Sequence, residues 1–218
     1  MYAELTAMPS LETLLLFTAA AFAMNALPGP SNLYVLSRSI AQGPRAGLVA
    51  AVGLASGSLI HACLTAAGLA AVFAYSPAAY AIFKLVGGGY LVWLGIQHLR
   101  TRAAHALPGD ALPQKSMRRV YGESIAVELL NPKTALFFLA FLPQFTNAAA
   151  GPVAPQLLLL GAITVATAIP CDAMVALGAG GVARAIRRNP RILAWQNRVS
   201  GAILIGLGAW VALARRTS

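Results

Sequence analysis

The sequence predicts an all-α integral membrane protein with six transmembrane helices, arranged as two inverted three-helix repeats. Of its 218 residues, 58% are hydrophobic and 10% are charged, whereas a soluble globular domain carries about 25% charged residues. Apolar segments recur along the chain, each close to the roughly 20 residues that cross a bilayer. A helix-breaking motif interrupts the first and the fourth of these segments. These three observations together indicate the fold class.

Six apolar segments are predicted to cross the membrane. The second contains only His61 as an ionisable residue, the fourth contains Glu128 and Lys133, and the fifth contains Asp172. The first has no basic residue before it, which distinguishes it from a signal peptide and predicts a span that is not cleaved. In order, the segments are Leu14–Leu36, Ala46–Ala74, Pro77–Leu99, Ser124–Phe145, Pro155–Gly181 and Leu193–Ala214.

The net charge of +10 comes mainly from basic residues in the connections between the apolar segments. Basic residues lie after the first, third and fifth segments, and the connections between carry none. By the positive-inside rule, these basic connections are expected to face the cytoplasm and both termini the periplasm. Arg215 and Arg216 at the C-terminus are the exception. The surplus charge is thus expected to set orientation, not to bind nucleic acid. The residues are Arg38, Arg45, Arg100, Arg102, Lys115, Arg118, Arg119, Arg184, Arg187, Arg188 and Arg191.

The long basic connection divides the chain into two halves. We expect one membrane domain over residues 1–218, with a first repeat at 9–100, a cytoplasmic loop at 101–122 and a second repeat at 123–214. Three spans in each half force the halves to insert in opposite orientations. This is the arrangement of an inverted repeat.

Each half opens with a span that prolines interrupt. Pro28, Gly29 and Pro30 break the first span, and Pro132 breaks the fourth and frees the carbonyl of Glu128 four residues earlier. Pro132 lies 102 residues after Pro30, so the two breaks occupy corresponding places. Interrupted spans at matching positions indicate the midplane site of a transporter. The alternative is that the prolines only kink packed helices.

The broken helix ends offer complementary groups to a zwitterion. Helix N-termini and the donors Asn131 and Lys133 suit a carboxylate, whereas freed carbonyls with nearby acids suit an ammonium group. We therefore expect a site for an amino acid made by residues of both breaks. These are Pro28, Gly29, Pro30, Ser31, Asn32, Asn131, Pro132 and Lys133.

Three ionisable residues within the spans are candidates for proton coupling. A charged group inside a membrane costs about 2.5–3.5 kcal/mol, so its presence indicates a function. Glu128 lies one turn before the second break; an ion pair with Lys133 or Lys84 is the alternative. For Asp172 the alternative is a vestibule position or an ion pair with a loop arginine. His61 is a candidate proton relay, because histidine is the side chain that generally changes charge near neutral pH; the alternative is a neutral, hydrogen-bonded residue within the bundle.

The sequence contains no motif for a cofactor, a metal or catalysis. It lacks the ATP-binding P-loop pattern, H-E-x-x-H and G-x-S-x-G. His61 and Cys63 are two residues apart and point to different helix faces, so they are not expected to share a metal. Proton exchange is the expected driving force. The alternatives are a metal-ion exporter or non-transporting scaffold, and an intramembrane enzyme.

Small residues indicate where helices approach one another closely. Gly43 and Gly47, and then Gly53 and Gly57, are spaced as in helix-packing motifs. Such pairs serve contacts within the bundle or in a homodimer. The run 87–89 of three glycines also indicates a close helix crossing.

Several of these motifs, in this order and spacing, resemble the LysE/RhtB family of amino-acid exporters. The resemblance implies proton-coupled export of amino acids or close derivatives across a bacterial inner membrane, with protons, lipid and the amino acid as partners and no cofactor. Family members export lysine and arginine, or neutral substrates such as homoserine, threonine and branched-chain amino acids. We expect a neutral substrate here. The stretches are Pro28–Pro30, Gly43, Gly47, Gly53, Gly57, Lys84–Gly87, Tyr90–Gly95, Leu129–Leu139 and Phe141–Phe145.

Overall fold

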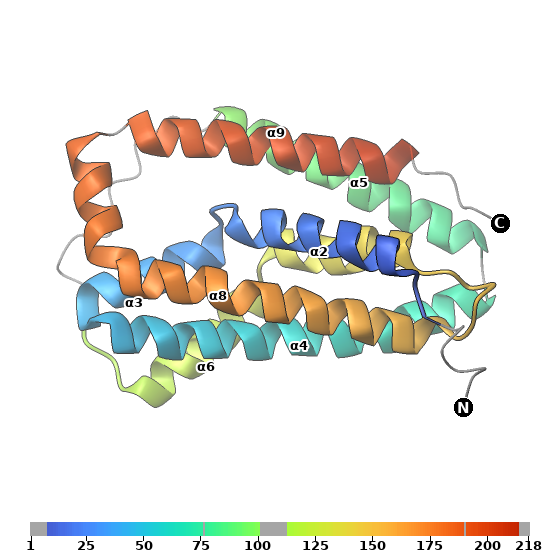
Figure 1. The fold of residues 1–218 in the computed structure, drawn as a ribbon, viewed down its shortest axis with the longest axis horizontal. Coiled ribbons are helices and arrows are strands. Elements are labelled where there is room, and N and C mark those ends of the chain that lie inside the picture. The colour runs from blue at the N-terminus through green and yellow to red at the C-terminus, as the bar shows by residue number, and fades with distance from the viewer. Residues whose placement is uncertain (1–7, 76, 101–112, 190, 214–218) are drawn as a thin grey trace.

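The computed structural model describes residues 8–75, 77–100, 113–189 and 191–213. Within them the chain is helical apart from short connections, so the predicted all-α membrane fold is confirmed (Figure 1). A π-helical turn and a 3-10 turn follow α7. The elements are α2 (Leu11–Ala26), α3 (Pro30–Gln42), α4 (Pro44–Tyr75), α5 (Pro77–Arg100), α6 (Met117–Leu129), α7 (Pro132–Leu136), the π turn (Phe137–Phe141), the 3-10 turn (Leu142–Phe145), α8 (Val153–Arg188) and α9 (Arg191–Leu213).

The predicted segments differ in how they become helices. The second and fifth form α4 and α8, whose stretches Pro44–Gly68 and Val153–Ala185 are each long and apolar enough to cross a membrane. The first and fourth form bent pairs, α2 with α3 at 51° and α6 with α7 at 48°. The third and sixth form α5 and α9. The apolar part of α9, Asn197–Leu213, is shorter than the apolar stretches of α4 and α8. Six spans in an inverted repeat therefore stay a prediction.

Helix α6 begins at Met117, inside the stretch 101–122 that was expected as loop; residues 101–112 lie outside the described residues. Ser116 supplies a side-chain cap, because its hydroxyl accepts the N–H of Arg119 at 3.3 Å. Arg119 Nε and Lys115 Nζ then bind Glu123 at 2.9 and 2.6 Å. The first turn of this helix is polar, so hydropathy did not reveal it.

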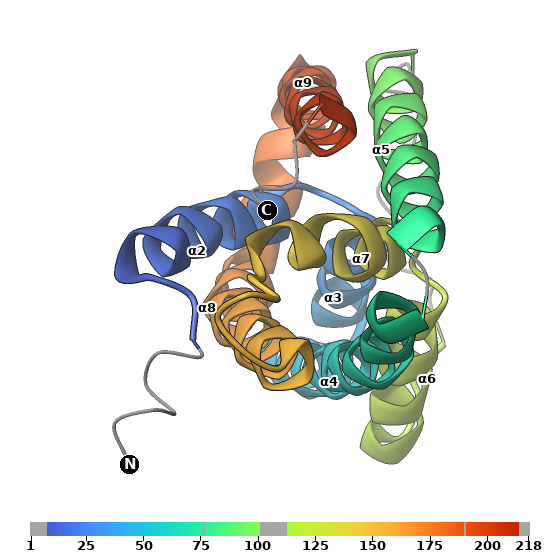
Figure 2. The same cartoon turned by 90° about the vertical axis from the view of Figure 1, so that its right-hand side faces the viewer.

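Helices at corresponding places in the two halves pack side by side. α4 lies against α8 in one layer and α5 against α9 in another, with the broken helices adjoining the α4–α8 layer (Figures 1 and 2). Two glycine pairs allow the close contact of α5 with α9. An added Cβ at Gly95 or at Gly201 would lie 2.6 Å from the carbonyl oxygen of the other. Gly88 and Gly208 oppose each other in the same way, which confirms the predicted close crossing.

The two ends of the bundle carry different residues. The beginning of α2 and the end of α9 lie at one end (Figure 1). Phe17 on α2 lies 5.1 Å from Phe145, and Trp210 on α9 lies 5.5 Å from Phe141, measured between ring centroids. The α3–α4 turn, the start of α6 and the end of α8 lie toward the opposite end, and they carry Arg45, Arg118, Arg119 and Arg184.

Candidate functional site at the two helix breaks

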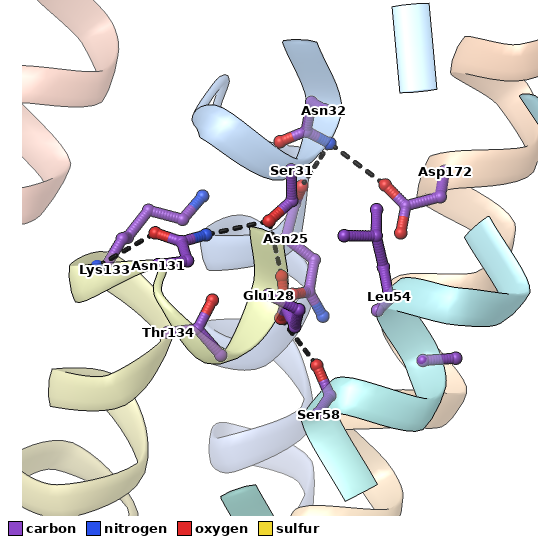
Figure 3. A pocket seen from close by; sticks show the side chains of 12 residues that line it. Asn25, Ser31, Asn32, Leu54, Ser58, Glu128, Asn131, Lys133, Thr134 and Asp172 are labelled. Atoms are coloured by element: carbon purple, nitrogen blue, oxygen red, sulfur yellow. Dashed lines mark hydrogen bonds between the residues drawn. The ribbon is translucent and has the colours of Figure 1, made fainter. Parts of the chain in front are cut away.

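A small polar cavity lies where the two helix breaks meet α4 and α8 (Figure 3). Its volume is about 30 Å³, similar to the share of one water molecule in the liquid. In this conformation the cavity is therefore too small to hold an amino acid. The lining residues are Asn25, Ser31, Asn32, Leu54, Ala55, Ser58, Glu128, Asn131, Lys133, Thr134, Ala168 and Asp172.

The first break separates α2 from α3. Leu27 takes an extended conformation after the last residue of α2, and α3 starts with Pro30 in its first turn, as a residue without an N–H can do at no cost. The carbonyl that Pro28 frees, on Met24, accepts the Leu27 N–H at 3.3 Å and the Lys133 ammonium at 3.0 Å. Gly29 caps α3 without a side-chain hydrogen bond.

The second break separates α6 from α7. Asn131 caps α7, because its Oδ1 accepts the N–H of Lys133 at 3.0 Å. The carbonyl that Pro132 frees, on Glu128, accepts the Asn131 N–H at 3.1 Å and lies 3.2 Å from Nε2 of His61. Both freed carbonyls thus find one main-chain donor and contact one side chain.

The carboxylate of Glu128 is the centre of the cavity. Ser31 donates its hydroxyl to Oε2, and Ser58 on α4 donates its hydroxyl to Oε1 at 2.6 Å. Asn131 in turn donates to the Ser31 oxygen at 2.8 Å, as the dashed lines in Figure 3 mark. Glu128 is only 5% exposed, so these donors replace the hydration that the carboxylate has lost.

Close packing of α4 on α6 seats Glu128. An added Cβ at Gly57 would lie 2.7 Å from Cβ of Glu128, and one at Gly53 would lie 2.6 Å from Cβ of Ser124. The predicted close approach at this glycine pair is therefore confirmed, and it occurs within the bundle. A homodimer contact stays an untested prediction.

The second buried acid, Asp172, enters from α8. Its Oδ1 accepts a hydrogen bond from Asn32 at 3.2 Å, and its side chain is 7% exposed. Asn32 also donates to the main-chain carbonyl of Asn25 at 3.4 Å, and Asn25 donates to the Thr164 carbonyl and to Oγ1 of Thr167 on α8, both at 3.0 Å. These hydrogen bonds connect the acid and its helix α8 to the first break.

Lys133 is buried beside both acids but binds main-chain carbonyls. Its ammonium donates to the oxygens of Met24 at 3.0 Å and of Leu27 at 2.8 Å. The ion pairs found in the described part of the chain both belong to Glu123, so none joins Lys133 to Glu128 within 4.0 Å. The side chain of Lys84, the other expected partner of Glu128, lies outside the described residues.

The structure brings together Ser31, Asn32, Asn131, Lys133 and, with them, the two acids Glu128 and Asp172. The remaining predicted residues do not line the cavity. Pro30 and Pro132 are exposed, while Pro28 and Gly29 shape the backbone of the break. His61 contacts the main chain of Glu128 and stacks on Phe138 with ring centroids 5.7 Å apart, as the packed alternative for this residue expects.

Sequence reasoning missed Asn25, Ser58 and Thr134 as lining residues. Asn25 had a signal, since it is the only amide in α2 and the only polar residue in its second half, from Ala19 to Ala26. Ser58 is one of several hydroxyl residues on α4, and only the packing of α4 on α6 selects it. Among the residues that the structure describes, no three His, Cys, Asp or Glu side chains form a group suited to a metal.

Comparison of the sequence with known proteins identifies a family of membrane transporters. The sequence model of the LysE type translocator family matches residues 22–215. A membrane protein of Vibrio cholerae is 33% identical over 210 residues, which cover 92% of this chain and 95% of the relative. A homoserine/homoserine lactone efflux protein of Salmonella typhimurium is 34% identical over 195 residues, with 86% and 90% covered. A leucine efflux protein of Enterobacter sp. is 28% identical over 201 residues, with 90% and 93% covered.

No solved structure matches this chain. The relatives are membrane and efflux proteins, and the matched region contains both helix breaks and the cavity between them. The multi-pass membrane chain, with its two broken helices, belongs to the LysE type translocator family.

Proposed function

We propose that this protein is a secondary exporter that moves amino acids or close derivatives out of a bacterial cytoplasm in exchange for protons. Family membership and the two efflux relatives, one named for homoserine and its lactone and one for leucine, support the export of such molecules. The single observation that carries the proposal is the cavity between the two breaks, in which Glu128 and Asp172 are buried together.

Glu128 is the group that binds the substrate ammonium. It lies in the last turn of α6, where the helix carbonyls add partial negative charge. The hydroxyls of Ser31 and Ser58 each donate to one oxygen of its side chain and so fix the orientation of the carboxyl group. A cationic group entering beside Glu128 would thus meet an acidic side chain that is already oriented.

The N-terminus of α3 is the complementary place for the substrate carboxylate. Its first turn carries the positive end of the helix dipole, and Gly29 offers no side chain to cap it. Ser31 and Asn32 stand in this turn and line the cavity. The amide of Asn131 adds a donor 2.8 Å from the Ser31 hydroxyl. Lys133, expected to bind the carboxylate as well, has its ammonium on the α2 carbonyls.

Asp172 carries the exchanged proton in this proposal. It lies on the face of α8 that continues, one turn at a time, through Ala176, Ala179 and Ala183. These three small residues line a second cavity of about 540 Å³ between α3, α4 and α8. This larger cavity has room for an amino acid and serves as the cytoplasmic vestibule, with Arg184 at its lining.

Transport proceeds by alternating access in this scheme. The site between the breaks, which is too small for an amino acid in this conformation, represents a contracted state, and the two halves, as inverted repeats, rock about it. The pairing of α4 with α8 and of α5 with α9 supports such a repeat. The basic ends of α6 and α8 face the cytoplasm, and both termini are periplasmic.

Efflux from proteoliposomes tests the proposal. Proteoliposomes that contain the purified protein are loaded with a panel of labelled neutral and cationic amino acids, and a pH gradient is imposed across their membrane. We expect efflux of neutral amino acids that rises with the gradient and stops when the gradient is dissipated. Efflux of no amino acid in the panel, or efflux indifferent to the gradient, would contradict the proposal.

A further inference from the structure

The C-terminal end of α2 is an anionic helix end with no cation of its own. The carbonyl end of a helix carries about half a negative charge, and α2 has no basic residue in its last turn. Pro28 also removes the N–H that would bond the Met24 carbonyl. The ammonium of Lys133, from the other half of the chain, lies 3.0 Å from this oxygen and 2.8 Å from that of Leu27.

Lys133 stands where its own helix disfavours it. It follows Pro132 in the first turn of α7, near the positive end of that helix. It is also only 7% exposed, and a buried ammonium is costly unless it is well bonded. The hydrogen bonds to the end of α2, together with the nearby acids Glu128 and Asp172, therefore compensate for the burial of a lysine at this position.

The first break provides room for the lysine side chain. An added Cβ at Gly29 would lie 3.3 Å from Nζ of Lys133 and 3.5 Å from its Cε. A side chain here would press on the ammonium end of the lysine. Gly29 thus leaves a passage through which Lys133 reaches the carbonyls of Met24 and Leu27.

The corresponding residue of the other break makes a different contact. Ser31 follows Pro30 as Lys133 follows Pro132. Each side chain contacts the C-terminal end of the broken helix in the other half, α6 for Ser31 and α2 for Lys133. Ser31 donates to the carboxylate of Glu128, whereas Lys133 donates to carbonyls. A positive charge is therefore supplied at the first break and not at the second.

We propose that the carbonyl oxygens of Met24 and Leu27 form a site for a monovalent cation, in which the Lys133 ammonium is a covalently tethered occupant. In many transporter folds, carbonyls at the broken ends of helices coordinate Na⁺. Here the tethered ammonium keeps Na⁺ and K⁺ out, and its removal opens the site to a free alkali cation. Only the consequence that export needs no Na⁺ rests on the proposed function.

Thermal unfolding of the purified full-length protein tests the site without transport. Wild type, Lys133→Ala and Lys133→Arg are compared in choline chloride, NaCl and KCl at equal ionic strength. In choline we expect Lys133→Ala to unfold about 5 °C below wild type, since the variant loses the two hydrogen bonds from the ammonium to the carbonyls of Met24 and Leu27. NaCl or KCl should restore part of this loss with a saturable dependence.

The control variants separate a cation site from a general effect of the lysine. Lys133→Arg keeps a cation and should show no difference between the salts, as should wild type. Lys115→Ala removes a lysine that binds Glu123 outside the site, and its unfolding temperature should be equal in all three salts. A Lys133→Ala protein indifferent to the salts would overturn the proposal, as would one that folds in no salt while Lys133→Arg folds. Specific stabilisation of wild type by Na⁺ would overturn it too.

Efflux separates this inference from the proposed function. Wild-type protein should export equally when Na⁺ is replaced by choline on both sides of the vesicle. Efflux that requires Na⁺ would contradict the coupling consequence and leave amino-acid export standing. Efflux in neither medium would count against the proposed function, while the unfolding temperatures would still decide the cation site.

Discussion

The two helix breaks have similar geometry and opposite charge. They bend the chain by 51° and 48°, and at each one proline frees a carbonyl that is then bonded by a nearby N–H. At the first break the freed carbonyl of Met24 also binds the Lys133 ammonium. At the second, the freed carbonyl of Glu128 contacts the ring of His61, and the carboxylate of the same residue lies beside it.

This difference assigns different tasks to two similar helix ends. A helix C-terminus attracts a cation, and the first break already has one that the chain supplies. The second combines a helix C-terminus with a carboxylate and has no ammonium bonded to that carboxylate among the described residues. In the proposed function, the substrate ammonium is therefore assigned to the second break.

Neutralising the acid of the second break should have the largest effect. For Glu128→Gln we expect loss of efflux on the order of 100-fold, because a buried charge partner is worth about 3 kcal/mol. Efflux is measured in proteoliposomes that contain equal amounts of inserted protein. Glu123→Gln is the matched control on the same helix, outside the cavity, and should change efflux less than about threefold. If both variants lost efflux equally, the loss would come from removing any acid on α6 and not from the cavity around Glu128.

Added methyl groups compare the packing at the two breaks. Gly57→Ala should reduce efflux on the order of 30-fold, because its Cβ would lie 2.7 Å from Cβ of Glu128 and overpacking costs about 1–3 kcal/mol. Gly29→Ala should reduce it about fivefold, because its Cβ meets only the flexible end of Lys133 at 3.3 Å. Gly68→Ala, on α4 with nothing within 4 Å, is the control and should be unchanged. The reverse order of the first two would contradict the assignment of Glu128.

Removing one hydroxyl tests the donors of the carboxylate. Ser58→Ala should raise the substrate concentration for half-maximal efflux about tenfold, since one hydrogen bond to a charged group is worth about 1.5 kcal/mol at least. Ser56→Ala serves as the control, because that hydroxyl bonds Tyr121 and the Val52 carbonyl. An unchanged half-maximal concentration for Ser58→Ala would argue that Glu128 does not bind the substrate.

The smallest effect is expected at the histidine of the second break. His61→Phe keeps an aromatic ring against Phe138 and removes one neutral hydrogen bond, worth about 0.5–1.5 kcal/mol. Efflux should fall about threefold with an unchanged dependence on the pH gradient. A flattened pH dependence would instead restore His61 as a group of the proton pathway, the role its titration range suggested.

Part of the site could be predicted from sequence, because helix breaks and acids in apolar segments are recognised from residues that are adjacent in the chain. Pro28 and Pro30 flank a glycine and Pro132 follows the helix-capping Asn131, and these combinations end a helix, so both breaks were found at their places. A proline without such neighbours, Pro170, lies inside α8 and does not end it. Buried acids are rare in apolar segments, which singled out Glu128 and Asp172. Ser58 was missed because a serine hydroxyl in a helix is ordinary until a neighbouring helix brings a carboxylate to it.

The sequence by itself determined the membrane class, the family, the two breaks and the acidic residues near them. These depend on composition and on short-range backbone chemistry. Only the tertiary structure decided how the groups are paired. Lys133 donates hydrogen bonds to carbonyls at the end of α2, and Ser31 donates one to Glu128 on α6, so each half of the chain bonds the other. The physical reason is distance in the chain: about 100 residues separate each donor from its acceptor, and helix packing alone brings them within hydrogen-bonding reach.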